Sequence, residues 1–186
     1  MSAQNYALCA ATTTYVCAQA NFSLTGGGNT LVMEIYNGVT AATRDSSSTL
    51  SELYVFGAPL SGRTISLASQ QFFDDGVLGG NTSWTFADGP GNSGNIHSWE
   101  AALDGNGNSG ISSCGGPATD YSEGGGKFHV QSCSPANILN GSGDYAIFHF
   151  VLSGAALQAI DLTKLGWGFH AQQLWDGGSV KCVTAG

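Results

Sequence analysis

The chain has little charge of either sign. Lys, Arg, Asp and Glu make up 10% of its 186 residues, whereas about 25% is usual for a soluble domain. Five basic residues face thirteen acidic ones, which gives a formal net charge of −8. Nucleic-acid binding depends on cationic side chains that neutralise phosphates, so we expect no nucleic-acid partner. An anionic membrane surface is disfavoured for the same reason.

Long apolar runs are also missing. No stretch approaches the ~18 consecutive apolar residues of a transmembrane helix, so we expect no membrane insertion by this segment. Residues 6–16 lean towards apolar, but three threonines interrupt them and no basic region precedes them. This pattern does not fit a signal peptide. If the protein is exported, we expect that its signal peptide has been removed from this sequence.

Glycine and short alternating segments are abundant instead. Many of the 28 glycines cluster with Asn, Ser and Asp, a composition that favours turns. Between these clusters apolar and polar residues alternate with period two, as they do in strands. The sequence therefore predicts one all-β domain over 1–186, a jelly-roll-like antiparallel β-sandwich with at most one short helix, within 154–165. The segments expected to contain strands are 8–24, 30–36, 53–56, 83–87, 96–102, 127–131, 144–152, 165–174 and 179–183.

Two of these strands carry more specific expectations. The segment 144–152 is apolar on both sides, which predicts a central strand that is covered on both faces. In the segment 30–36, Leu31, Met33 and Ile35 share one side. Alternation then places Glu34 on the opposite side, away from the core.

Five cysteines in a chain with so few charges indicate an oxidising compartment, hence a secreted or cell-surface protein. We predict a disulfide between Cys114 and Cys133, and a second between Cys9 and Cys17 that would close a hairpin. Cys182 is then the odd thiol, although pairing of Cys9 or Cys17 with Cys182 stays open. A zinc site is disfavoured because no Cys-x-x-Cys spacing is present.

Several motifs occur in a recognisable order. Residues 31–37 read Leu-Val-Met-Glu-Ile-Tyr-Asn, and residues 50–56 read Leu-Ser-Glu-Leu-Tyr-Val-Phe. An Asp-Leu link then precedes the Gly-Phe-His-Ala-Gln strand at 168–172, and Gly-Ser follows at 178–179. This order resembles the ectodomains of exosortase-sorted (PEP-CTERM) bacterial surface proteins. The resemblance implies export, a surface or extracellular-matrix location and an all-β fold, but no particular activity. The family's Pro-Glu-Pro sorting motif, transmembrane segment and basic tail do not follow Val183.

A cation site is one candidate function. Asp104, Asn106 and Asn108 offer side-chain oxygens at alternate positions, as calcium loops do, and Asp120 or Glu123 could add a ligand. An ordinary turn is the alternative, and the loop is not an EF-hand because the twelfth position is Gly rather than Glu. Two or three of the histidines in predicted strands could also meet on one face and bind a transition metal, or could simply be partly buried and hydrogen-bonded: His129, His149 and His170.

Catalysis has weaker support than binding. No Gly-x-Ser-x-Gly elbow is present, and a carboxylate pair for glycoside hydrolysis would have to come from Glu34, Glu52 or Glu100. Exposed aromatic residues could instead stack on sugars, with Trp175 and Trp99 as the candidates, aided by Asn106 and Asn108. The leading prediction is a non-catalytic secreted or cell-surface protein of the extracellular-matrix, adhesion or assembly type. The alternatives are a carbohydrate-binding module that binds polysaccharide and a small secreted hydrolase.

Overall fold

The computed structural model describes the backbone of residues 4–11, 15–37, 49–74, 77–79, 84–86, 127–132, 144–172 and 180–183. Several predicted features lie outside these residues and stay predictions. They are the strand at 96–102, the calcium loop with Asp104, Asn106 and Asn108, the candidate sugar-binding residues Trp99 and Trp175, and the cysteines Cys114 and Cys133.

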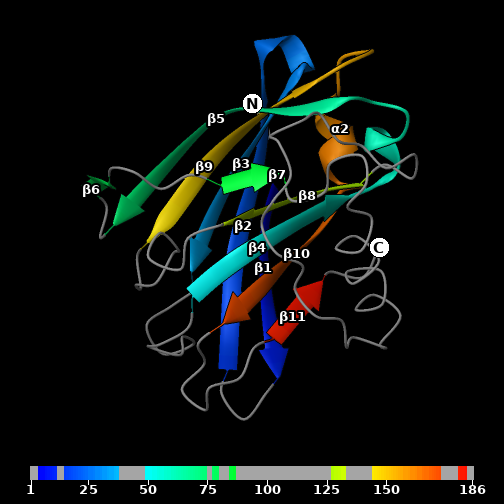
Figure 1. Cartoon of the computed structure of the whole chain (residues 1–186). Coiled ribbons are helices and arrows are strands. Elements are labelled where there is room, and N and C mark those ends of the chain that lie inside the picture. Colours follow the sequence, from blue (N-terminus) through cyan, green and yellow to red (C-terminus); the bar gives the residue numbers. More distant parts are fainter. Residues whose placement is uncertain are drawn as a thin grey trace.

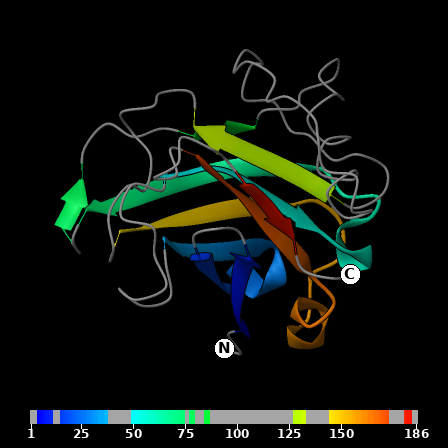
Figure 2. The ribbon, with the colours of Figure 1, turned by 90° about the horizontal axis from the view of Figure 1, so that it is seen from below.

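The described strands form two sheets, and every pairing between them is antiparallel. In Figure 2 the yellow-green β8 and the blue β1 to β3 lie on opposite sides of the molecule. The chain passes repeatedly from one sheet to the other (Figure 1), as in jelly-roll sandwiches. The six-stranded sheet has the order β1 (Gln4–Ala11), β2 (Tyr15–Thr25), β3 (Thr30–Asn37), β9 (Tyr145–Leu152), β5 (Ile65–Asp74) and β6 (Val77–Gly79). The five-stranded sheet has the order β11 (Val180–Val183), β10 (Gly166–Gln172), β4 (Thr49–Phe56), β8 (Lys127–Ser132) and β7 (Trp84–Phe86).

The core between the sheets is rich in aromatic side chains. Phe128 of β8 and Phe150 of β9 are fully buried, and their ring centroids lie 4.5 Å apart. Because β8 and β9 belong to different sheets, this contact joins the two layers. Phe148 adds an edge-on contact with Phe72 at 5.7 Å. Full burial of one such side chain contributes about 1.5–3 kcal/mol, so this aromatic layer is a major source of stability.

The predicted all-β sandwich is confirmed, as is a short helix in 154–165, which is α2 (Ala159–Leu162). The central position of β9 is also confirmed, since it lies between β3 and β5. The expected cover on both of its faces is wrong: Tyr145, Ile147 and His149 are half-buried, and Val151 is 42% exposed. These residues lie on the solvent side of the sheet, where they are shielded in part by cross-strand neighbours.

Strands β5 and β6 are absent from the sequence prediction. The reason for β5 is a bulge at Ala68, where the register with β9 shifts between Leu67 and Ser69. Before the bulge Ile65 and Leu67 pair with core-facing residues of β9, and after it Phe72 does so. The side of the strand that faces the core therefore changes from odd to even positions. Apolar and polar residues therefore do not alternate regularly along β5, and the period-two pattern that predicts a strand is lost.

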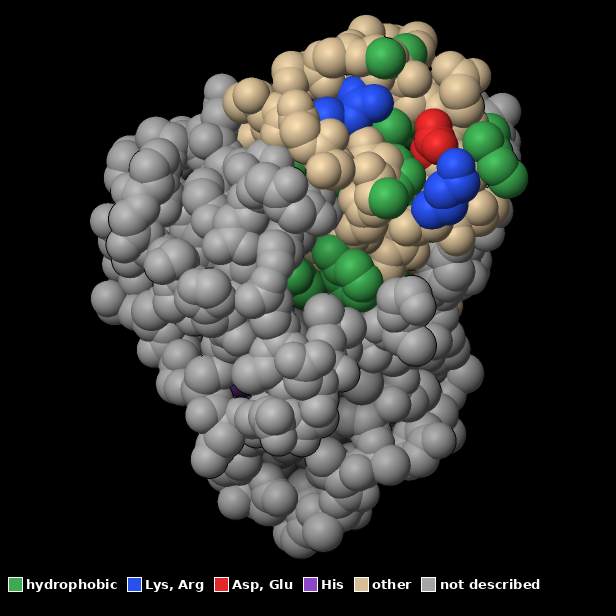
Figure 3. Space-filling view, turned by 90° about the vertical axis from the view of Figure 1, so that its right-hand side faces the viewer, with side chains coloured by type: hydrophobic (Ala, Val, Ile, Leu, Met, Phe, Trp, Pro, Cys, Tyr) green, Lys and Arg blue, Asp and Glu red, His purple; other side chains and the backbone are tan. Residues whose placement is uncertain are grey.

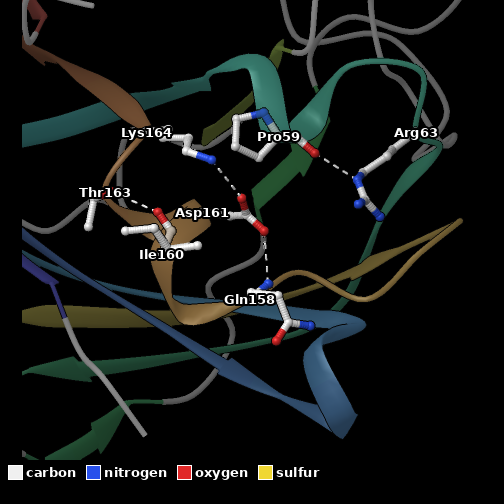
Figure 4. Close-up of polar contacts among 7 residues, drawn as sticks. All are labelled: Pro59, Arg63, Gln158, Ile160, Asp161, Thr163 and Lys164. Atoms are coloured by element: carbon white, nitrogen blue, oxygen red, sulfur yellow. Dashed lines mark hydrogen bonds and ion pairs between the residues drawn. The ribbon is translucent and has the colours of Figure 1, made fainter.

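One end of the sandwich is closed by polar contacts with main-chain atoms. Arg63 donates through Nε to the carbonyl of Pro59 at 2.7 Å (Figure 4), and through Nη1 to the carbonyls of Ser153, at 2.8 Å, and Ala155. Thr64 and Ser153 exchange two further bonds. The residues before β5 are thereby tied to the segment after β9. Figure 3 shows the basic and acidic side chains of this end close together on the surface.

The helix α2 lies at the same end and is only one turn long. The backbone N–H of Gln158 donates to the carboxylate of Asp161 at 2.9 Å, and Nζ of Lys164 lies 3.2 Å from the other carboxylate oxygen (Figure 4). The bond from the Gln158 N–H, followed by the bond from Lys164, lowers the pKa of Asp161. The carboxylate therefore serves as a helix cap, which gives these residues a structural role.

We predict that Gly28→Ala lowers the free energy of unfolding by about 1–3 kcal/mol. Gly28 has φ of +95°, and an added Cβ would lie 2.3 Å from the carbonyl oxygen of Leu157, so strain and a backbone clash combine. The matched control is Gly27→Ala in the same turn, where φ is +69° but nothing lies within 4 Å of the added Cβ. Denaturant unfolding should show the larger loss for Gly28→Ala. Equal losses in the two variants would contradict the clash.

Candidate functional site

The side of the six-stranded sheet that faces away from the core is the best candidate for a binding surface. Its side chains alternate with the buried ones along β2, β3, β9 and β5, and they are half-buried or exposed. We call this set the outer face. Its members are Gln19, Asn21, Ser23, Val32, Glu34, Tyr36, Ser66, Ser69, Gln71, Phe73, Tyr145, Ile147, His149 and Val151.

Three aromatic residues of the outer face lie side by side across three strands. Strand pairing sets Tyr36 of β3 opposite Tyr145 of β9, and Tyr145 opposite Phe73 of β5. The Tyr36 and Tyr145 rings are stacked with centroids 5.0 Å apart, and the Tyr145 and Phe73 rings with centroids 4.3 Å apart. We call these three residues the aromatic row. The register continues it onto β6, where Leu78 pairs with Phe73 and is 60% exposed.

The stacking decides what the aromatic row can bind. β9 lies between β3 and β5, so the Tyr145 ring has a neighbour on each of its two faces. A ring that stacks on a sugar must present a free face. Both faces of the Tyr145 ring are already covered by its neighbours. The row therefore presents ring edges and hydroxyl groups to a partner, held in place by the stack.

Glu34 is the one carboxylate of the outer face, and it is bound within the face. The Tyr36 hydroxyl, two residues further along β3, donates a hydrogen bond to the Glu34 carboxylate. Burial of the ring, then this bond and the negative charge of Glu34, raise the pKa of Tyr36 to about 12. Glycoside hydrolysis needs two carboxylates flanking the scissile bond. Among the described residues of the outer face, Glu34 is the single carboxylate.

Alternation correctly placed Glu34 away from the core. The expectation that two or three of the histidines meet on one face is wrong. His149 lies on the outer face, whereas His129 and His170 belong to the other sheet, on strands that are separated by β4. His170 is 2% exposed, which fits the alternative of a buried histidine. Within the described part of the chain no group of three His, Cys, Asp or Glu side chains is arranged to hold a metal ion.

The sequence reading missed the aromatic row. Two of its residues, Tyr36 and Tyr145, stand in strands that were predicted, and the outward position of Tyr145 could have been inferred from alternation. The third, Phe73, follows the bulge in β5, and its neighbour Phe72 is the buried one. Only the pairing of three strands that are distant in sequence brings the rings together.

No helix in the described ranges is long and apolar enough to cross a membrane.

Comparison with known proteins gives distant structural neighbours only. No family model matches the chain, and no curated protein matches it. A solved structure described as "pH-induced modulation of Streptococcus parasanguinis adhesion by Fap1 fimbriae" is similar with a TM-score of 0.37 and 10% identity, over 99% of this chain and 92% of that one. A second, "BspA_C_WT", is similar with a TM-score of 0.28 and 9% identity, over 98% of this chain and 59% of that one. Both likenesses are too distant to carry a function over to this chain.

We predict that Tyr36→Phe removes a late phase from the alkaline titration of the phenols. The pKa of Tyr36 is raised from 10.0 to about 12, so the folded state holds this proton more tightly than the unfolded state does. The stabilisation is complete below pH 10 and is lost as the pH rises towards 12. Phenolate absorbance during alkaline titration measures the late phase. Tyr145→Phe, which leaves the bond to Glu34 in place, is the control and should keep it. A late phase that persists in Tyr36→Phe would contradict the assignment.

Proposed function

We propose that this chain is a non-catalytic protein of the adhesion or assembly type that works outside the cytoplasm and makes its contacts through the outer face. The observation that carries this proposal is the aromatic row, a stack of three rings on the solvent side of the sheet. Tyr combines an apolar ring with a polar hydroxyl and is enriched at protein interfaces for that reason. Because stacking already restricts these rings, binding would cost little further side-chain entropy.

The stack favours a protein partner over a polysaccharide. Sugar recognition by aromatic residues uses free ring faces, and both faces of Tyr145 are covered by its neighbours. The exposed Leu78 continues the row as an apolar side chain at the margin of the sheet (β6, Figure 1). A surface of ring edges, hydroxyls and aliphatic groups suits packing against another protein.

The partner that the charges favour most is a second copy of the chain. The net charge of −8 opposes contact between two copies in general. The outer face carries a single carboxylate, Glu34, so two copies could approach through it with little repulsion. In a two-fold contact the same surface is used on both copies, so a residue that contacts a second residue of the other copy is matched by the reverse contact. Glu34 and His149 lie on neighbouring strands of the face, so such a contact can set the carboxylate of one copy against the imidazole of the other.

The location outside the cytoplasm is supported by composition. Few charges, abundant Gly, Ser and Asn, and five cysteines are typical of exported β-rich proteins. The resemblance to exosortase-sorted ectodomains would place the protein at the bacterial cell surface or in the matrix. A precursor that carries a signal peptide and a Pro-Glu-Pro sorting tail would support this assignment, and an intracellular location in the native host would refute it.

The substitution Ile147→Lys tests the contact surface. Ile147 lies on the outer face between Glu34 of β3 and Gln71 of β5. Burying the new ammonium group in an interface should weaken self-association by about tenfold or more. Light scattering over a concentration series measures the effect. The matched control is Ile160→Lys on α2, where Ile160 is 61% exposed and is not a member of the outer face, and its association should equal that of the wild type.

Three other outcomes would refute the proposal. A wild-type protein that stays monomeric at every concentration removes the second copy as the partner. Retardation of that monomer on polysaccharide gels, abolished by Ile147→Lys, would show a carbohydrate-binding module. Equal weakening in both lysine variants would show that association does not depend on the outer face.

A further inference from the structure

We propose that Cys9 and Cys17 form a disulfide across the first hairpin, and that Cys182 stays outside this bond. The observation is the register of the β1–β2 pair, in which Cys9 and Cys17 are direct partners. The sequence alone left open whether either residue pairs with Cys182. This inference stands on the strand register and does not depend on the proposed function.

The backbone separation at this position suits a disulfide. Directly opposed residues of an antiparallel pair have Cα atoms about 4.5 or 5.5 Å apart, depending on whether they exchange hydrogen bonds. Disulfides in proteins usually span about 4.4–6.8 Å between Cα atoms. Both kinds of antiparallel position fall in that range, so the bond can form without a change of register.

The sides of the strands separate Cys182 from the pair. Ala18 and Ala20 of β2 are fully buried in the core. Because successive residues of a strand lie on opposite sides, the position of Cys17 is on the other side of β2, with Gln19 and Asn21. Cys9, as the direct partner of Cys17, shares that side. Cys182 is instead paired with Phe169, which is fully buried in the core. Although β1 and β11 are neighbours in space, these register positions lie on opposite sides, towards the solvent and towards the core.

The reaction is an ordinary thiol–disulfide exchange. The two thiols lose two protons and two electrons, and one S–S bond forms between Cys9 and Cys17. The electrons reduce the disulfide of an oxidant such as oxidised glutathione or a thiol–disulfide oxidoreductase to two thiols. The product ties β1, which is at the edge of its sheet, to β2. An edge strand held by a covalent bond is less free to separate and pair with other chains.

Peptide mapping of the full chain tests the proposal. The protein is folded in a buffer of reduced and oxidised glutathione, alkylated without reduction and digested with chymotrypsin. Cleavage after Tyr15 separates Cys9 from Cys17 in sequence. The expected result is a pair of peptides that remain linked, with both cysteines unalkylated, and that separate on reduction.

Two variants test which cysteines are paired. Cys9→Ser should make Cys17 fully open to alkylation, whereas Cys182→Ser should leave the linked peptides unchanged. If a variant fails to fold, the map of the wild type decides alone. A peptide that links Cys182 to Cys9 or Cys17 would overturn the proposal, as would full alkylation of both hairpin cysteines in the wild type. None of these outcomes depends on whether the protein self-associates.

Discussion

The packing of Phe128 against Phe150 is the contact on which the rest of the structure depends, because it joins one sheet to the other. Each sheet is an antiparallel ribbon with one apolar side, and neither could bury that side alone. Around this pair lie the other large buried side chains, which include Phe148 from one sheet and Trp167 and Phe169 from the other. The outer face is available for binding only because the core has taken the opposite side of the same strands.

Strand β9 shows how one segment can serve both purposes. Its even positions, Phe148 and Phe150 among them, fill the core, while its odd positions form the middle of the outer face. Apolar residues on both sides of a strand suggested burial on both sides. In the protein, side chains on β3 and β5 partly cover the odd positions, and two aromatic rings stack on Tyr145. Contacts between aromatic side chains of neighbouring strands thus bury part of this side of β9, although among the described residues no further layer of secondary structure covers it.

The general architecture follows from the sequence because alternation and turn residues are local signals. They were sufficient for the β3 and β9 strands, for the short helix and for the outward position of Glu34. The aromatic row could not be predicted in this way. Its formation depends on which strands become neighbours, and β3 and β9 are separated by more than a hundred residues of chain. The proposed disulfide between Cys9 and Cys17 is intermediate: proximity in sequence suggested it, and the strand register favours it over a bond with Cys182.

The bulge at Ala68 decides which residues of strand β5 belong to each side of the sheet. In β5 the inward side is odd before Ala68 and even after it, as Ile65 and Phe72 show. If Ala68 were paired as an ordinary strand residue, the alternation would continue unbroken, and Phe73 would face the core while Phe72 faced the solvent. One unpaired residue thus sorts two adjacent phenylalanines, the first into the core and the second into the aromatic row.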